Sequence, residues 1–263
     1  MRSQHTLETI LKKDRLFIIG GLLVLCMLAW WYIIYLYQQM NVMNMAAFLF
    51  AMPMTPTWSM QDFLLIFLMW FVMMIAMMTP SVTPLILIFA MVNRQKKERR
   101  SPFVPTAYLL CGYFLVWAGF SMLATLLQWL LQKISMLNPQ MVTTNKILGG
   151  LILITAGMFQ FTAMKQSCLN SCRNPIDFIH LNWKEGKARA FRMGIEHGFF
   201  CLICCWALMI LLFVSGIMNL LWIVLIAIFV LIEKALPKMK WISFIAGAVL
   251  IVYGALLLLK PWQ

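Results

Sequence analysis

Acidic side chains are scarce in this sequence, which has only eight Asp and Glu residues among 263. Hydrophobic residues make up 63% of the chain, a composition that excludes a water-soluble globular protein. The sequence also lacks a nucleotide-binding loop, a catalytic serine motif and a zinc-protease helix, which argues against an ATP-driven hydrolase. We therefore favour a membrane protein that binds a ligand over an enzyme.

Long uncharged stretches divide the chain into membrane-spanning segments. They lie at residues 16–37, 63–92, 101–132, 147–164, 197–232 and 241–259. The fifth has 36 residues, which as one helix would be about 54 Å long against a hydrocarbon core of roughly 30 Å. We expect Ser215, Gly216 and Asn219 to break it into two helices. The sequence predicts an all-α, polytopic membrane protein with about seven transmembrane helices.

The distribution of positive charge predicts the orientation of these helices. Of the 21 Lys and Arg residues, 18 lie in residues 1–15, 93–105, 165–193 and 234–240. Because cytoplasmic loops are enriched in positive charge, we expect a cytoplasmic N-terminal arm followed by one transmembrane domain over residues 16–263. The net charge of +13 then reflects topology and attraction to anionic membrane lipid, not nucleic-acid binding. The first apolar run lacks a small-x-small cleavage site, so we expect a retained helix.

Five of the seven cysteines fall within 38 residues, and His197 lies one helical turn before the third of them. They are Cys168, Cys172, His197, Cys201, Cys204 and Cys205. The last four share one face of a helix by spacing, and the first two lie one helical turn apart. Thiolates and imidazoles are ligands of soft or borderline metal ions, so the pattern predicts a metal site in the inner leaflet. The alternative is that these cysteines are small packing residues at a helix contact.

Methionine supplies a second set of sulfur atoms, with 23 residues in the chain. Two i,i+4 pairs lie on adjacent stripes of the second span, namely Met73 with Met77 and Met74 with Met78. A possible outer-loop site consists of Met40, Met43, Met45, Met52 and Met54. Thioethers are neutral donors that suit Cu(I), although methionine is equally a flexible packing residue. We expect Pro80 and Pro84 to kink the second span, with Ser81 and Thr83 bonding the freed carbonyl groups.

Charged and polar groups at the edges of the spans require a partner or a role, because their burial is costly. We assign supporting roles to Gln160, Lys165, Glu196 and Glu233. Lys165 and Lys234 are the nearest cations by topology, and for Glu233 we favour a structural ion pair with the adjacent Lys234. Spans three and seven are interpreted as scaffold.

Three sequence blocks resemble a family of bacterial integral membrane proteins that is described as predicted metal-binding. They are MMIAMMTPS at residues 73–81, QFTAMKQSCLNSCRNP at 160–175 and HGFFCLICCWALM at 197–209, with Glu233-Lys234 as a weaker fourth match. The resemblance implies metal binding in a multi-pass protein of the bacterial inner membrane, but no particular reaction. Ile203 replaces a glycine that is usual in the family, which puts a tight helix contact in doubt.

These features lead to one main functional hypothesis and several alternatives. We expect a membrane protein that binds copper, or zinc as second choice, and either transports the ion or delivers it to an acceptor protein. A thiol-disulfide oxidoreductase using Cys201 with Cys204 is the first alternative. An accessory subunit of a larger membrane complex and a haem or iron-sulfur electron carrier are the others.

Overall fold

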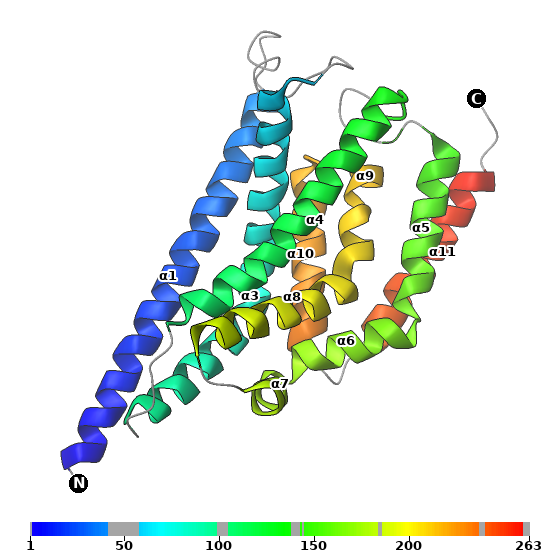
Figure 1. The fold of residues 1–263 in the computed structure, drawn as a ribbon. Helices are drawn as coiled ribbons and strands as arrows, with labels where there is room; N and C mark the ends of the chain where they lie inside the picture. Colours follow the sequence, from blue (N-terminus) through cyan, green and yellow to red (C-terminus); the bar gives the residue numbers. More distant parts are fainter. Residues whose placement is uncertain are drawn as a thin grey trace.

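The structure is a computed structural model that describes residues 2–41, 58–98, 105–137, 143, 145–183, 186–236 and 240–259. Helices joined by turns make up almost all of these residues, and no β-strand occurs among them. The helices are α1 (Arg2–Asn41), α3 (Met60–Glu98), α4 (Ala107–Lys133), α5 (Lys146–Gln160), α6 (Ala163–Arg173), α7 (Pro175–Asn182), α8 (Lys187–Ile210), α9 (Leu212–Ser215), α10 (Leu220–Ala235) and α11 (Lys240–Leu259) (Figure 1). The predicted all-α class is confirmed.

Five helical segments are long and apolar enough to cross a membrane. They are Arg15–Gln39, Met60–Arg94, Ala107–Lys133, Lys187–Ser215 and Trp241–Leu259. A sixth crossing results if α5 and α6, which meet at an angle of 63°, form one broken span. The sixth predicted span, after the turn at Gly216, corresponds to α10, whose 16 residues extend only about 24 Å. The count of seven therefore stays a prediction.

Two breaks in the helices have local causes that the sequence contains. At the predicted turn, α9 ends at Ser215 and Gly216 adopts a φ of +99°, which a glycine accepts without strain. The fourth span is broken at Thr162, whose hydroxyl accepts a hydrogen bond from the backbone N–H of Lys165 at 3.3 Å and thereby caps α6.

Helix α3 contains both Pro80 and Pro84 without interruption in its assignment. Pro80 cannot donate to the carbonyl of Ala76, and that carbonyl instead accepts from the thiol of Cys26 in α1 at 3.7 Å. The hydroxyl groups of Ser81 and Thr83 donate to the carbonyls of Met78 and Thr79. The expected rescue of freed carbonyls by these two hydroxyls was therefore wrong, because each bonds a neighbouring carbonyl.

The helices pack so that α3, α4, α8 and α10 surround a common interior. Figure 1 shows α1 alongside α3 at one side of the bundle and α5 alongside α11 at the other, and these pairs are in contact. Helix α4 packs along α8, and α6 lies against α8 near the predicted cytoplasmic end. The interior contains the largest buried side chains, among them Trp70, Tyr113, Trp117 and Lys165.

Candidate functional site

Helix α8 carries four of the predicted ligands on its buried face. His197, Cys201, Cys204 and Cys205 are each at most 3% exposed, as the helical spacing predicted. The thiols of Cys204 and Cys205 donate to the carbonyl oxygen of Cys201 at 3.0 and 2.9 Å. These bonds hold both thiols close to the backbone of their own helix.

Helix α6 brings the remaining two cysteines to α8. The half-buried Cys172 lies near Cys201 and Cys204, where α6 packs against α8. Cys168, one turn earlier, is 7% exposed and lies on the Cys204 side of α6. The predicted convergence of the two cysteine segments is thus present, and four thiols from Cys172, Cys201, Cys204 and Cys205 form what we call the cysteine cluster.

The remaining cysteines lie apart from this cluster. Cys26 bonds the carbonyl of Ala76, and Cys111 is exposed on α4. All seven cysteines of the chain are free thiols in the structure.

A close crossing of α4 and α8 adds a tyrosine that the sequence analysis missed. A Cβ on Gly112 would lie 2.1 Å from the carbonyl oxygen of Phe191, and one on Gly194 would lie 2.1 Å from that of Leu109. The two backbones therefore touch, which only glycine at both positions permits. As a result the fully buried hydroxyl of Tyr113 lies 3.0 Å from Sγ of Cys201. The third span therefore contributes a side chain to the cluster as well as scaffold. Gly112 and Gly194 were the residues of the sequence that could have indicated this close crossing.

Lys234 of α10 is the positively charged group of the cluster. Its ammonium group donates to Sγ of Cys201 at 2.9 Å and to the hydroxyl of Ser81 in α3 at 3.3 Å. Cys172, Cys204 and Cys205 also lie near it, and the residue is 8% exposed. Lys234 therefore links the methionine-bearing helix α3 to the cysteine-bearing helix α8.

The expected ion pair between Glu233 and Lys234 was wrong. Adjacent helical residues point about 100° apart, so the two side chains face different neighbours. Glu233 instead pairs with Lys165 at 2.5 Å, and both side chains are buried. Gln160 accepts from Lys165, and Ser243 of α11 donates to Glu233. The seventh span thus contributes a polar contact as well as scaffold.

Glu196 does not belong to either buried group. Its carboxylate pairs with Arg192 at 3.0 Å on the outer side of α8, where both side chains are substantially exposed. Such an i,i+4 pair contributes little to stability and leaves Glu196 outside the cysteine cluster.

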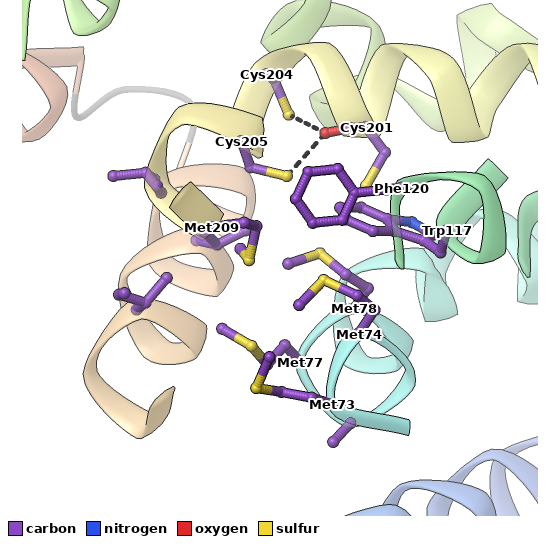
Figure 2. Packing of buried hydrophobic residues seen from close by; sticks show 14 of the residues in the cluster. Met73, Met74, Met77, Met78, Trp117, Phe120, Cys201, Cys204, Cys205 and Met209 are labelled. Atoms are coloured by element: carbon purple, nitrogen blue, oxygen red, sulfur yellow. Dashed lines mark hydrogen bonds between the residues drawn. The ribbon is translucent and has the colours of Figure 1, made fainter. Parts of the chain in front are cut away.

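The four predicted methionines of α3 are buried in the same interior as the cysteines. Met73, Met74, Met77 and Met78 are each at most 2% exposed. Figure 2 shows Met74 and Met78 directed toward the side of the bundle that holds Cys201 and Cys205, with Met73 and Met77 beyond them. Of the predicted outer-loop group, Met43, Met45, Met52 and Met54 and the side chain of Met40 lie outside the described residues.

His197 is buried one turn before Cys201. Its ring packs against Phe178 and Tyr113 at centroid distances of 5.0 and 6.1 Å. Nδ1 is buried and has no hydrogen-bond partner within the described part of the chain. In that part, no three side chains of His, Cys, Asp or Glu are arranged to hold a metal ion.

Comparison with known proteins identifies the family. The model of the PpoB2 family, described as copper chaperone, matches residues 67–257, which include the methionine pairs, the cysteine cluster and both buried lysines. The chain belongs to this copper chaperone family. Neither the curated proteins nor the solved structures include a significant match. The family assignment supports a function related to copper and gives no support to zinc, the second metal considered.

Proposed function

We propose that this protein binds Cu(I) inside the membrane at the cysteine cluster and delivers it to an acceptor protein. The observation that carries the proposal is the convergence of four thiols from α6 and α8 in the buried interior that also holds the methionines of α3. Thiolate and thioether sulfurs are soft donors that favour Cu(I). Membership of a copper chaperone family supports the same ion.

The order of the donors suggests a path for the ion. Neutral thioethers bind Cu(I) without losing a proton, whereas thiols must be deprotonated to bind it strongly. We infer that the methionines pass the ion to the cysteine cluster. With about seven spans and a cytoplasmic N-terminus, this order corresponds to inward movement of Cu(I).

Loading requires local rearrangement of the cluster. The thiols of Cys204 and Cys205 donate hydrogen bonds to the carbonyl oxygen of Cys201, and the ammonium group of Lys234 donates one to Sγ of Cys201. Copper entry therefore exchanges weak hydrogen bonds for Cu–S bonds. His197, whose Nδ1 is unpartnered among the described residues, is available as a further ligand from the next turn of the helix.

Metal content of the purified protein tests this function. Detergent-purified protein is loaded with Cu(I) under reducing conditions, and bound copper is measured after gel filtration. We expect about one copper per chain, and its loss in a variant carrying Cys201→Ser with Cys204→Ser. Cys111→Ser, which removes an exposed thiol on α4, is the matched control and should retain copper. Unchanged copper in the double variant would refute the assignment.

The same preparation distinguishes the oxidoreductase alternative. A thiol-disulfide exchange protein would bind no copper and would cycle its thiols between reduced and disulfide forms at a defined potential. The burial of Cys201, Cys204 and Cys205 disfavours it, because a protein disulfide could not reach sulfurs that are each 1% exposed. Absence of both copper and redox cycling would favour the structural-subunit alternative.

A further inference from the structure

The buried ammonium group of Lys234 has an unusual set of partners. Among the residues the structure describes, no Asp or Glu forms a salt bridge with it, because Glu233 is paired with Lys165. Its hydrogen bonds go to Cys201 and Ser81, and its other electrostatic neighbours include three further cysteines. A buried cation needs compensating negative charge, and here the cysteine sulfurs are the groups placed to supply it.

We propose that Lys234 is a specificity-determining residue that makes the cysteine cluster select a monovalent metal ion over a divalent one. This inference rests on the proposed function, since it concerns the ion bound by the same sulfurs. Lys234 keeps its proton throughout and contributes one fixed positive charge beside Cys201. It does not bind the metal ion itself.

Charge balance in the low-dielectric interior distinguishes the two ions. One Cu(I) bound by the thiolate of Cys201 and a second thiolate carries a net charge of minus one, which Lys234 neutralises. Zn(II) bound by the same two thiolates is neutral, so the complex with Lys234 would carry an uncompensated positive charge. In the loading step two Cu–S bonds to thiolates form and the bonds from Cu(I) to the methionine thioethers that deliver it break. A cysteine ligand that is still protonated loses its S–H proton to bulk water, and copper remains Cu(I).

The position of Lys234 also suits this role. Its ammonium group bridges Cys201 on α8 and Ser81 on α3, and the hydroxyl of Ser81 in turn donates to the carbonyl of Met78 at 2.9 Å. The fixed charge therefore lies where the methionine pairs and the cysteine cluster meet. Because Ser81 is a second partner, the ammonium group can stay hydrogen-bonded when Cys201 turns toward an incoming ion.

The test compares Cu(I) and Zn(II) affinities of full-length variants by competition with chromophoric chelators. Lys234→Gln removes the charge without adding a sulfur donor, so we expect Cu(I) affinity to fall by on the order of 100-fold or more. Zn(II) affinity should be unchanged or higher, which lowers the Cu(I)/Zn(II) affinity ratio by at least that factor. Lys234→Arg should keep the ratio near that of the wild type. Lys187→Gln, at an exposed position on the same helix as the cysteines, is the control for removal of a distant charge.

Each other outcome contradicts the proposal. Unchanged Cu(I) affinity in Lys234→Gln would show that the charge is not used, and equal loss of affinity for both ions would show a structural role. A Cu(I)/Zn(II) ratio altered as much in Lys234→Arg as in Lys234→Gln would also overturn the proposal. These failures leave copper binding by the wild type intact, whereas a wild type that binds no Cu(I) would refute the proposed function as well.

Discussion

Removing the carboxylate of Glu233 should destabilise the protein more than any surface substitution. Glu233→Gln preserves the size of the side chain and its ability to accept a hydrogen bond from Ser243, but removes its negative charge. Lys165, whose ammonium group lies 2.5 Å from that carboxylate and is fully buried, would then be an unpaired charge. Glu233→Gln therefore measures how much the negative charge of this ion pair contributes to the stability of the protein.

The expected magnitude follows from the burial of both partners. Removing one partner of a buried ion pair typically costs about 3–5 kcal/mol, because the other charge stays desolvated without compensation. At roughly 3 °C per kcal/mol for a chain of this size, the unfolding midpoint should fall by about 10 °C. The double variant Lys165→Met with Glu233→Gln has neither charge, so it should recover at least half of that loss.

Unfolding in mixed detergent micelles, followed by the fluorescence of the buried tryptophans, provides the measurement. Arg192→Met is the control, because it breaks an exposed ion pair and should change stability by less than about 1 kcal/mol. The reasoning fails if Glu233→Gln is as stable as the control. It also fails if the losses of the two single variants simply add in the double variant, since neighbouring charges must couple.

Two further predictions concern the helix crossing and the methionines. Gly194→Ala places a Cβ 2.1 Å from a carbonyl oxygen of α4, so it should destabilise the protein by about 1–3 kcal/mol or more. Gly119→Ala on α4 is the control, because its Cβ would meet nothing within 4 Å and the change should be neutral. Thermal unfolding measures both variants, and equal stability of the two would contradict the close crossing. Met74→Leu with Met78→Leu keeps the packing but removes two thioethers, so stopped-flow mixing should show slower Cu(I) loading with unchanged final stoichiometry. The exposed Met91→Leu on the same helix should load normally, and a normal rate in the double variant would argue against a relay.

Local patterns in the sequence predicted the helices and the donors on them. The apolar runs marked the spans, and the residues around Gly216 marked the turn after α9. The i,i+4 spacing of Cys168 and Cys172 placed both on α6, and the spacing from His197 to Cys205 placed one buried face on α8. Such features depend on residues within two turns of one another, so a single chain contains enough information to predict them.

Contacts between distant helices were not predictable in the same way. Tyr113 reaches Cys201 only because α4 and α8 cross at Gly112 and Gly194, and the crossing depends on both helices together. The pairing of Glu233 was different, since elementary helix geometry already disfavours a contact with the next residue. Topology had already made Lys165 and Lys234 the nearest cations, but the sequence could not decide between them, and Lys165 lies 68 positions from Glu233.

The last turn of α10 connects the architecture of the protein to the chemistry of its candidate site. Glu233 holds Lys165 of α6 and Ser243 of α11 through its side chain, and its carbonyl oxygen accepts two hydrogen bonds from Arg173 at 2.9 and 2.7 Å. Arg173 directly follows Cys172, so these bonds also hold the α6 thiol beside α8. Lys234, about 100° further around the same helix, faces Cys201. Glu233 therefore holds the cysteine segment of α6 at the cluster, and the next residue, Lys234, supplies the positive charge of the cluster.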